Sequence, residues 1–331
     1  MMQVRMGPQG ALIAVLVAVV WTGTIPVSAG ASTPSFCTSP GPILATAITS
    51  PIALSTCPIV GEQIVLPLPA GQVGNGVTVP TPGKGVENIA TSTSGETELT
   101  AVNSAGVLTV TLSTYARGSA GTTVSNTDAA CSETAYNYEG GLWVTTLNWY
   151  YNESSVSRSG LGVTATLDEV RQANANMTEG VNDCGYTGRF RAYGSFAGNT
   201  TKYANIDSSG DCTSSFPDGQ NTVSWGPFYG NSDLAVTCIA TAYPQGVHTI
   251  VEADIYLGSN VGLVTTLPSP CTTSYDLESI TTHEWGHAYG MAHETSGDLE
   301  TMYPYSYTCA TLARTLANGD WHGMANLYGT S

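Results

Sequence analysis

The most informative part of this chain is His283-Glu284-Trp285-Gly286-His287-Ala288-Tyr289-Gly290-Met291-Ala292-His293. It has the form H-E-x-x-H-x-x-G-x-x-H, with every fixed position filled. Residues i and i+4 of an α-helix lie on one face, about one turn apart, so His283 and His287 can direct two imidazoles at one ion. Ser274 or Asp276 can cap such a helix at its start. The stretch therefore predicts a helix that carries a metal site.

A third ligand follows from the glycine of this motif. Gly290 can adopt a left-handed conformation, end the helix and turn the chain, which brings His293 back toward the first two imidazoles. Three protein ligands and a water form the open site of a catalytic zinc, whereas a structural zinc normally has four protein ligands. Glu284 lies beside the first ligand and is the candidate general base for that water. The alternative is a helix whose surface histidines bind nothing.

The sequence after this motif resembles the metzincin zinc endopeptidases. Those enzymes place a methionine in a tight turn beneath the zinc, and Met302 in Thr301-Met302-Tyr303-Pro304-Tyr305 matches it. The Met-Tyr-Pro run is similar to the matrixin branch, in which this segment lines the pocket for the substrate residue after the scissile bond. Glu294, directly after the third histidine, is instead the astacin-like residue. The resemblance implies that Gly290 and Met302 support the site without taking part in the chemistry.

The resemblance covers roughly residues 140–331 and implies an α+β fold. It predicts a metzincin-type catalytic domain, in which a twisted mixed sheet is accompanied by a long helix, an active-site helix and a C-terminal helix. Thr166 and Glu169 form a candidate capping box for the long helix. Asn318 is a candidate cap for the closing helix, and Gly329 is a candidate stop.

The function that the resemblance implies is a zinc-dependent endopeptidase acting on protein or peptide substrates. His283, His287 and His293 would bind the zinc, and Glu284 would act as general base on a zinc-activated water. Two other readings remain open. One is a non-catalytic extracellular binding or matrix protein on a metzincin-like scaffold, which the intact Glu284 disfavours. The other is a zinc hydrolase acting on glycopeptides. No organic cofactor is predicted.

The chain is expected to be secreted and to have three parts. Residues 1–29 are predicted to be a signal peptide, because the apolar run Ala11–Trp21 is followed by small residues suited to cleavage. That run is too short for the ~20 residues that span a bilayer. Residues 30–130 form a β-rich N-terminal region and a candidate propeptide. Residues 131–331 form the metzincin-like zinc protease domain.

The N-terminal region is rich in Pro, Gly, Ser, Thr and Val and shows no helical periodicity. Alternating runs such as Gly106–Leu112 predict strands. The region is either a propeptide that blocks the zinc or a retained β module. Matrixins block their zinc with the cysteine of a Pro-Arg-Cys-Gly-type motif, and the sequence has no such motif. A thiol switch is therefore not predicted, and steric blocking stays open.

Eight cysteines in an exported chain favour disulfide bonds over a second metal site, since no C-x-x-C pair is present. Proximity in sequence suggests that Cys37 pairs with Cys57 and Cys271 with Cys309.

Composition excludes two classes of partner. The formal net charge of -16 disfavours binding to nucleic acid or to an anionic membrane. We expect a monomer. Asp207, Asp211 and Asp218 lie in a Gly/Ser-rich stretch that is a candidate calcium site, although their spacing fits no calcium-loop template and favours an ordinary polar loop.

Overall fold

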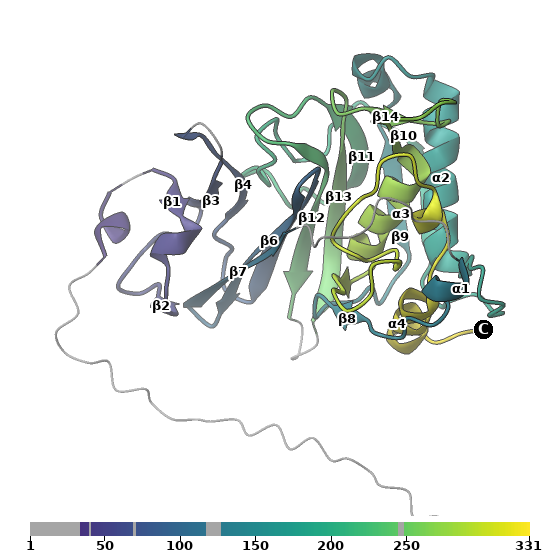
Figure 1. The fold of residues 1–331 in the computed structure, drawn as a ribbon. Coiled ribbons are helices and arrows are strands. Elements are labelled where there is room, and N and C mark those ends of the chain that lie inside the picture. The colour runs from purple at the N-terminus through teal and green to yellow at the C-terminus, as the bar shows by residue number, and fades with distance from the viewer. Residues whose placement is uncertain (1–33, 40, 69–70, 117–126, 244–247) are drawn as a thin grey trace, which may run out of the picture. The chain divides into compact units, whose positions relative to one another are not determined.

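A nine-stranded sheet lies at the centre of the fold, and two segments distant in sequence contribute its strands (Figure 1). In spatial order the strands are β10 (Gly194–Asn199), β9 (Leu147–Tyr151), β11 (Asn221–Gly226), β13 (Thr249–Gly258), β12 (Asp233–Ala242), β5 (Lys84–Ser92), β6 (Gly95–Ser104), β7 (Val107–Ala116) and β2 (Ile52–Ala53). The first four are parallel to one another, and every pair from β13–β12 onward is antiparallel. The N-terminal strands therefore continue the sheet of the C-terminal half.

The computed structural model describes residues 34–39, 41–68, 71–116, 127–243 and 248–331. The predicted signal peptide at 1–29 lies outside the described residues. No described helix is long and apolar enough to cross a membrane.

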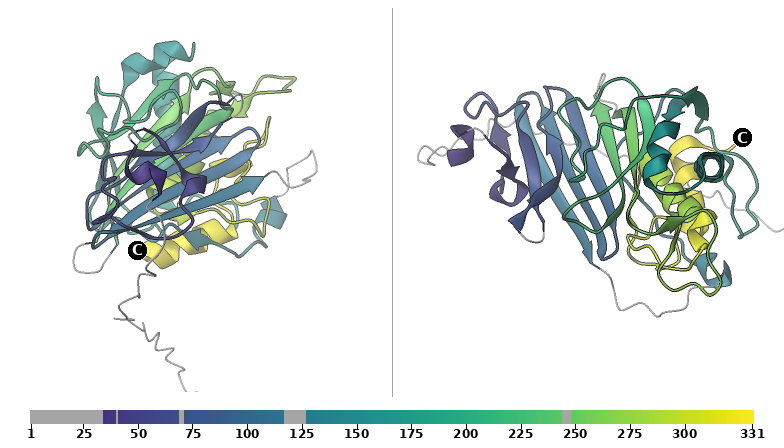
Figure 2. Two further views of the ribbon diagram at one scale, coloured as in Figure 1. Left: turned by 90° about the vertical axis from the view of Figure 1, so that its left-hand side faces the viewer. Right: turned by 90° about the horizontal axis from the view of Figure 1, so that it is seen from above.

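Two helices, α2 (Val163–Glu179) and α3 (Leu277–Ala288), cover one face of the sheet between β10 and β12, and α4 (Asn318–Tyr328) lies on the same side beside β16 (Figures 1 and 2). Apolar residues at helical spacing form the buried face of α2, which packs mainly against α3, and Val170 and Met177 on this face are fully buried. Trp285 of α3 packs against Trp149 of β9 with ring centroids 5.2 Å apart. These side chains belong to one apolar core between helices and sheet.

Two predicted helix caps were wrong. α2 begins at Val163, so Thr166 lies inside the helix, where its hydroxyl donates to the Val163 carbonyl instead of capping. α4 begins at Asn318 itself, and Asp320 rather than Asn318 accepts a hydrogen bond from the backbone N–H of Ala317. In both cases a polar residue suited to a cap stands one or more positions inside the helix. The predicted stop is confirmed, because Gly329 ends α4 with φ 73°.

The N-terminal strands form a second core. A three-stranded sheet of β1 (Ile43–Leu44), β3 (Gln63–Pro67) and β4 (Val73–Thr78) packs through β4 against β5 and β6. Its buried residues, such as Ile64 and Val77, share one cluster with Val236 of β12 and Tyr256 of β13. The second core therefore contains side chains from both halves of the chain.

Shorter elements complete the fold. They are α1 (Thr127–Ala130), the pairs β14 (Leu263–Val264) with β15 (Tyr275–Asp276) and β16 (Met291–Ala292) with β8 (Asn137–Tyr138), and the 3-10 turns Ser35–Cys37, Ala45–Ala47, Glu153–Arg158 and Leu312–Arg314.

Four disulfides are present, and the two predicted pairs are confirmed. The other two join Cys131 to Cys184 and Cys212 to Cys238. The α+β fold class, with its mixed sheet, long helix, active-site helix and closing helix, is also confirmed.

Candidate metal centre and active site

Helix α3 presents the first two histidines. Its N-terminus is capped by Asp276, which accepts a hydrogen bond from Ser279 N at 3.0 Å and pairs with the Arg314 guanidinium. The helix is buried along its whole length, so the spacing of four residues puts both imidazoles on one inward face. The Nε2 atoms of His283 and His287 lie 2.9 Å apart.

The turn at Gly290 delivers the third histidine. Gly290 has φ 91°, and a Cβ there would collide with the carbonyl oxygen of Gly141. The chain then reverses into β16, which pairs with β8. His293 follows and reaches the other two imidazoles. The predicted role of glycine at this position thus has two physical reasons, the backbone angle and the close approach of a neighbouring loop.

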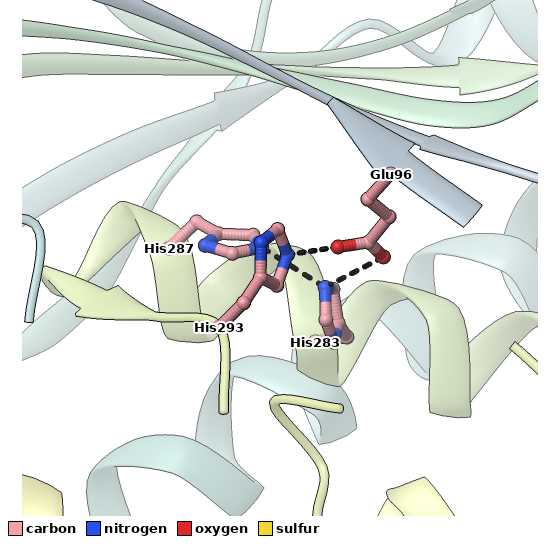
Figure 3. Close-up of side chains that lie close together, drawn as sticks. All are labelled: Glu96, His283, His287 and His293. Carbon is pink, nitrogen blue, oxygen red and sulfur yellow. Dashed lines mark hydrogen bonds and ion pairs between the residues drawn. The ribbon is translucent and has the colours of Figure 1, made fainter. Parts of the chain in front are cut away.

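A fourth side chain joins the three histidines. Glu96 of β6 points into the same space, and one ligand atom from each of the four residues lies within 4.8 Å of the others (Figure 3). Glu96 Oε1 is 3.1 Å from His283 Nε2, and Oε2 closely approaches His293 Nε2. All four residues are buried.

The outer nitrogens of the imidazoles are held by acceptors. His283 Nδ1 lies 2.6 Å from the Thr301 carbonyl and His287 Nδ1 lies 3.0 Å from that of Met291. His293 Nδ1 is 2.5 Å from Glu98 Oε1. A proton on each Nδ1 leaves the Nε2 lone pair directed inward, which is the arrangement of metal-binding histidines.

The inner atoms fit a zinc ion. Both oxygens of Glu96 and the Nε2 of His293 are buried without a hydrogen bond. Buried polar atoms are normally paired, so converging unpaired ones indicate an ion. Burial lowers the pKa of His287 and of His293, which keeps these imidazoles neutral. Burial alone would raise the pKa of Glu96, but the neighbouring His283 and His293 have the larger effect and lower this pKa. Glu96 therefore stays a carboxylate.

Glu284 lies beside this cluster and is fully buried. Its Oε1 accepts a 2.6 Å hydrogen bond from the Thr91 hydroxyl of β5, and its Oε2 accepts one from Thr237 of β12. Burial raises the pKa of Glu284, and this effect is larger than the opposite effect of the neighbouring His283 and His287. A carboxylate with a raised pKa is suited to taking up and returning a proton near neutral pH.

Met302 packs directly beneath α3. It is buried, and Gly286 leaves room for its sulfur against the helix. Asp320 of α4 fixes this turn, since its carboxylate accepts hydrogen bonds from Thr301 N at 2.6 Å and Met302 N at 3.1 Å. The closing helix therefore holds the loop that orients His283.

Glu300 supplies a pH-dependent contact at this turn. Burial and the charge of Asp320 raise the pKa of Glu300 to about 10, so the folded chain keeps a proton there that the unfolded chain releases above about pH 4.3. The unfolding free energy should therefore fall as pH rises between these values. Glu300→Gln should reduce the slope of the unfolding free energy with pH by an amount that corresponds to at most one proton. The slope is measured by urea unfolding of the variant and the wild type at pH 6, 7 and 8. Parallel profiles would contradict it.

The sequence-predicted site residues meet in space, with one addition. The structure brings together Glu284, His283, His287 and His293, with Gly290 and Met302 adjacent. Glu96 was missed. The available signal was the pair Glu96 and Glu98, two acidic residues on one face of a strand in a chain with only 10% charged residues.

The three candidate calcium residues do not converge. Asp207 accepts hydrogen bonds from Ser209 N and Asp211 N, whereas Asp218 pairs with Lys202 at 2.9 Å. Among the described residues, the group of His, Cys, Asp or Glu side chains able to hold a metal is the Glu96–histidine cluster.

An H-E-x-x-H helix, a glycine turn to a third histidine and a methionine turn beneath them, on a mixed sheet, define a metzincin. Residues 189–329 match the family model described as Matrixin, so this part of the chain is a matrixin-like metzincin domain. A stretch of 62 residues is 45% identical to Metalloendoproteinase 1 of Glycine max, covering 18% of this chain. The chain spans only 19% of that relative. The N-terminal strands and Glu96 lie outside the matched family segment.

Proposed function

We propose that this chain is a zinc-dependent endopeptidase. The observation that carries the proposal is the convergence of three buried imidazoles, each held at Nδ1, beside the buried carboxylate of Glu284. The matrixin match of residues 189–329 and the name of the soybean relative support the same activity.

His283, His287 and His293 would hold the zinc. When bound, zinc supplies a Lewis acid that activates water and polarises the substrate carbonyl. Glu284 would accept the proton of the attacking water and pass it to the nitrogen of the leaving amine. Its burial and its pKa direction suit both halves of this transfer.

A pocket beside His283 supports a peptide substrate. Its lining includes Ile280 of α3 and Tyr303, Tyr305 and Leu312 from the segment after Met302. In matrixins this segment surrounds the substrate residue after the scissile bond, and we assign the pocket the same role. Its tyrosines and Leu312 can contact an apolar side chain, and Asp298 and Glu300 in the same lining give the pocket an acidic part.

We further infer that the protein is exported and acts as a monomer on protein or peptide substrates. Four disulfides support an oxidising compartment. The glycopeptide hydrolase and the non-catalytic scaffold remain the rival functions, and a substrate panel separates them.

Metal content and chelator sensitivity test the proposed function. The purified chain should bind one zinc ion. After a second protease has digested residues 34–116, as followed by mass spectrometry, the chain should cleave denatured casein, and 1,10-phenanthroline should stop the cleavage. A chain that binds no zinc, or a zinc-loaded digested chain that cleaves neither casein nor peptides, would exclude an endopeptidase.

A further inference from the structure

The fourth side chain of the metal cluster comes from the N-terminal region, outside the matrixin-like segment. We propose that Glu96 is a fourth zinc ligand that closes the metal centre and holds the full chain in a latent state. This inference rests on the proposed function and adds its regulation. Four protein ligands are the mark of a closed zinc site, whereas catalysis needs one open position.

A tight hairpin positions the side chain of Glu96 next to the histidines. Strands β5 and β6 are joined through Thr93 and Ser94, with Ser92 paired to Gly95. The Ser92 hydroxyl donates to the Gly95 carbonyl at 2.6 Å, and Ser94 N donates to the Ser92 hydroxyl at 3.2 Å. These bonds fix the hairpin end one residue before Glu96.

One cross-strand pair contacts both the general base Glu284 and the metal-binding histidines. Thr91 of β5 and Glu96 of β6 are directly opposite in the register, so their side chains lie on one side of the sheet. Thr91 donates its hydroxyl to Glu284, while Glu96 approaches His283 and His293. The base and the metal site are therefore occupied by neighbouring side chains of the same hairpin.

Within the described part of the chain, Glu96 is paired only with the imidazoles of the metal cluster. Its side chain is completely buried, and neither oxygen accepts a hydrogen bond from a described residue. An unpaired buried carboxylate is costly, so a cation at the histidines is what this position requires. Glu98, on the same face of β6, differs because it lies on the Nδ1 side of His293 and accepts a hydrogen bond from Tyr115.

The same hairpin covers the edge of β12. Strand β5 pairs antiparallel with β12 from Asp233 opposite Ser92 to Ala242 opposite Lys84. The backbone groups on this side of β12, next to Thr237 and Glu284, are thus already hydrogen-bonded. A substrate strand could not pair with this edge while the hairpin is in place.

A cysteine does not provide the block. All eight cysteines form disulfides, and no described cysteine is free. This agrees with the absence of a cysteine-switch motif in the sequence. The carboxylate of Glu96 takes the position that a thiolate would need.

Access of a small ligand to the metal tests the proposal. The full chain is loaded with Co²⁺ and titrated with acetohydroxamate, and visible absorption reports the ligand set of the metal. If the fourth position is open in fewer than a tenth of wild-type molecules, Glu96→Gln should bind the probe at least about tenfold more tightly. Glu96→Ala is measured as well, because an amide oxygen can still ligate a metal.

Glu252→Gln is the matched control. It removes a buried carboxylate of β13 that accepts hydrogen bonds from the backbone N–H groups of Asp218 and Gly219 and is not part of the metal cluster, so its probe affinity should stay near wild type. Equal probe affinity in wild type, Glu96→Gln and Glu96→Ala, with identical Co²⁺ spectra, would overturn the proposal. A wild type that binds neither Co²⁺ nor Zn²⁺ would instead overturn the proposed function, so the two failures are distinguishable.

Discussion

Replacing Glu284 with glutamine is expected to reduce peptide cleavage by about 10²–10⁴-fold, the usual contribution of a general acid–base group. The amide keeps the shape of the side chain but cannot accept the proton of the attacking water. Zinc should stay bound, because His283, His287 and His293 are untouched. Cleavage is measured on the chain after digestion of residues 34–116, with zinc content determined in parallel.

Glu294→Gln is the control for this prediction. Glu294 is also a buried glutamate near the cluster, but its carboxylate only accepts hydrogen bonds from Ser296 N and Asn137. Its substitution should leave cleavage within a fewfold of wild type. Equal activity of Glu284→Gln and wild type would remove Glu284 from the reaction.

His287→Ala is expected to weaken zinc binding by at least about 10²-fold. Changes to residues that only orient a ligand already cost about 10–100-fold in affinity, and His287 is a proposed ligand. Zinc should therefore raise the unfolding free energy of the variant far less than that of the wild type. For wild type, zinc at 100 times its Kd adds about 2.7 kcal/mol to the unfolding free energy. Chelator competition and thermal unfolding with and without zinc measure both effects.

His322→Ala is the matched histidine control. His322 also lies on a helix, but it is exposed, makes an edge-to-face contact with Trp321 and is not part of the metal cluster. Its loss should leave the zinc affinity unchanged. A His287→Ala variant that still binds zinc as tightly as wild type would show that the metal lies elsewhere.

The local part of the site could be predicted from the sequence because helical spacing and a glycine turn are local. His283, His287, Glu284 and Gly290 lie within eight positions of one another, and their geometry follows from one helix and its end. The strands of the N-terminal region were also predictable in kind, as Gly106–Leu112 shows, although the strand itself is Val107–Ala116. These predictions required no knowledge of how distant segments pair.

The pairing of β5 with β12 could not be predicted. Strand register depends on contacts between segments far apart in sequence, and a polar strand such as Gly95–Ser104 has the pattern of a solvated edge. Glu96 therefore resembled an exposed charge until the fold buried it. The two wrong caps have a related cause, because both side chains bond residues distant in sequence: Thr166 accepts a hydrogen bond from the Tyr151 hydroxyl and Asn318 accepts one from the Tyr186 hydroxyl.

The second core has a consequence for activation. Cutting the chain after β7 would not by itself free the metal centre, since apolar side chains of both parts pack together in the second core. None of the four disulfides joins the two parts. The two pieces would stay assembled as a nicked complex, with the hairpin acting as a bound inhibitor. Dissociation of the N-terminal strands would expose the apolar side chains of Val236, Tyr256 and Phe228. Monomeric proteins rarely expose an apolar face of this kind. The slow step of activation would thus be dissociation of the N-terminal strands rather than cleavage of the chain.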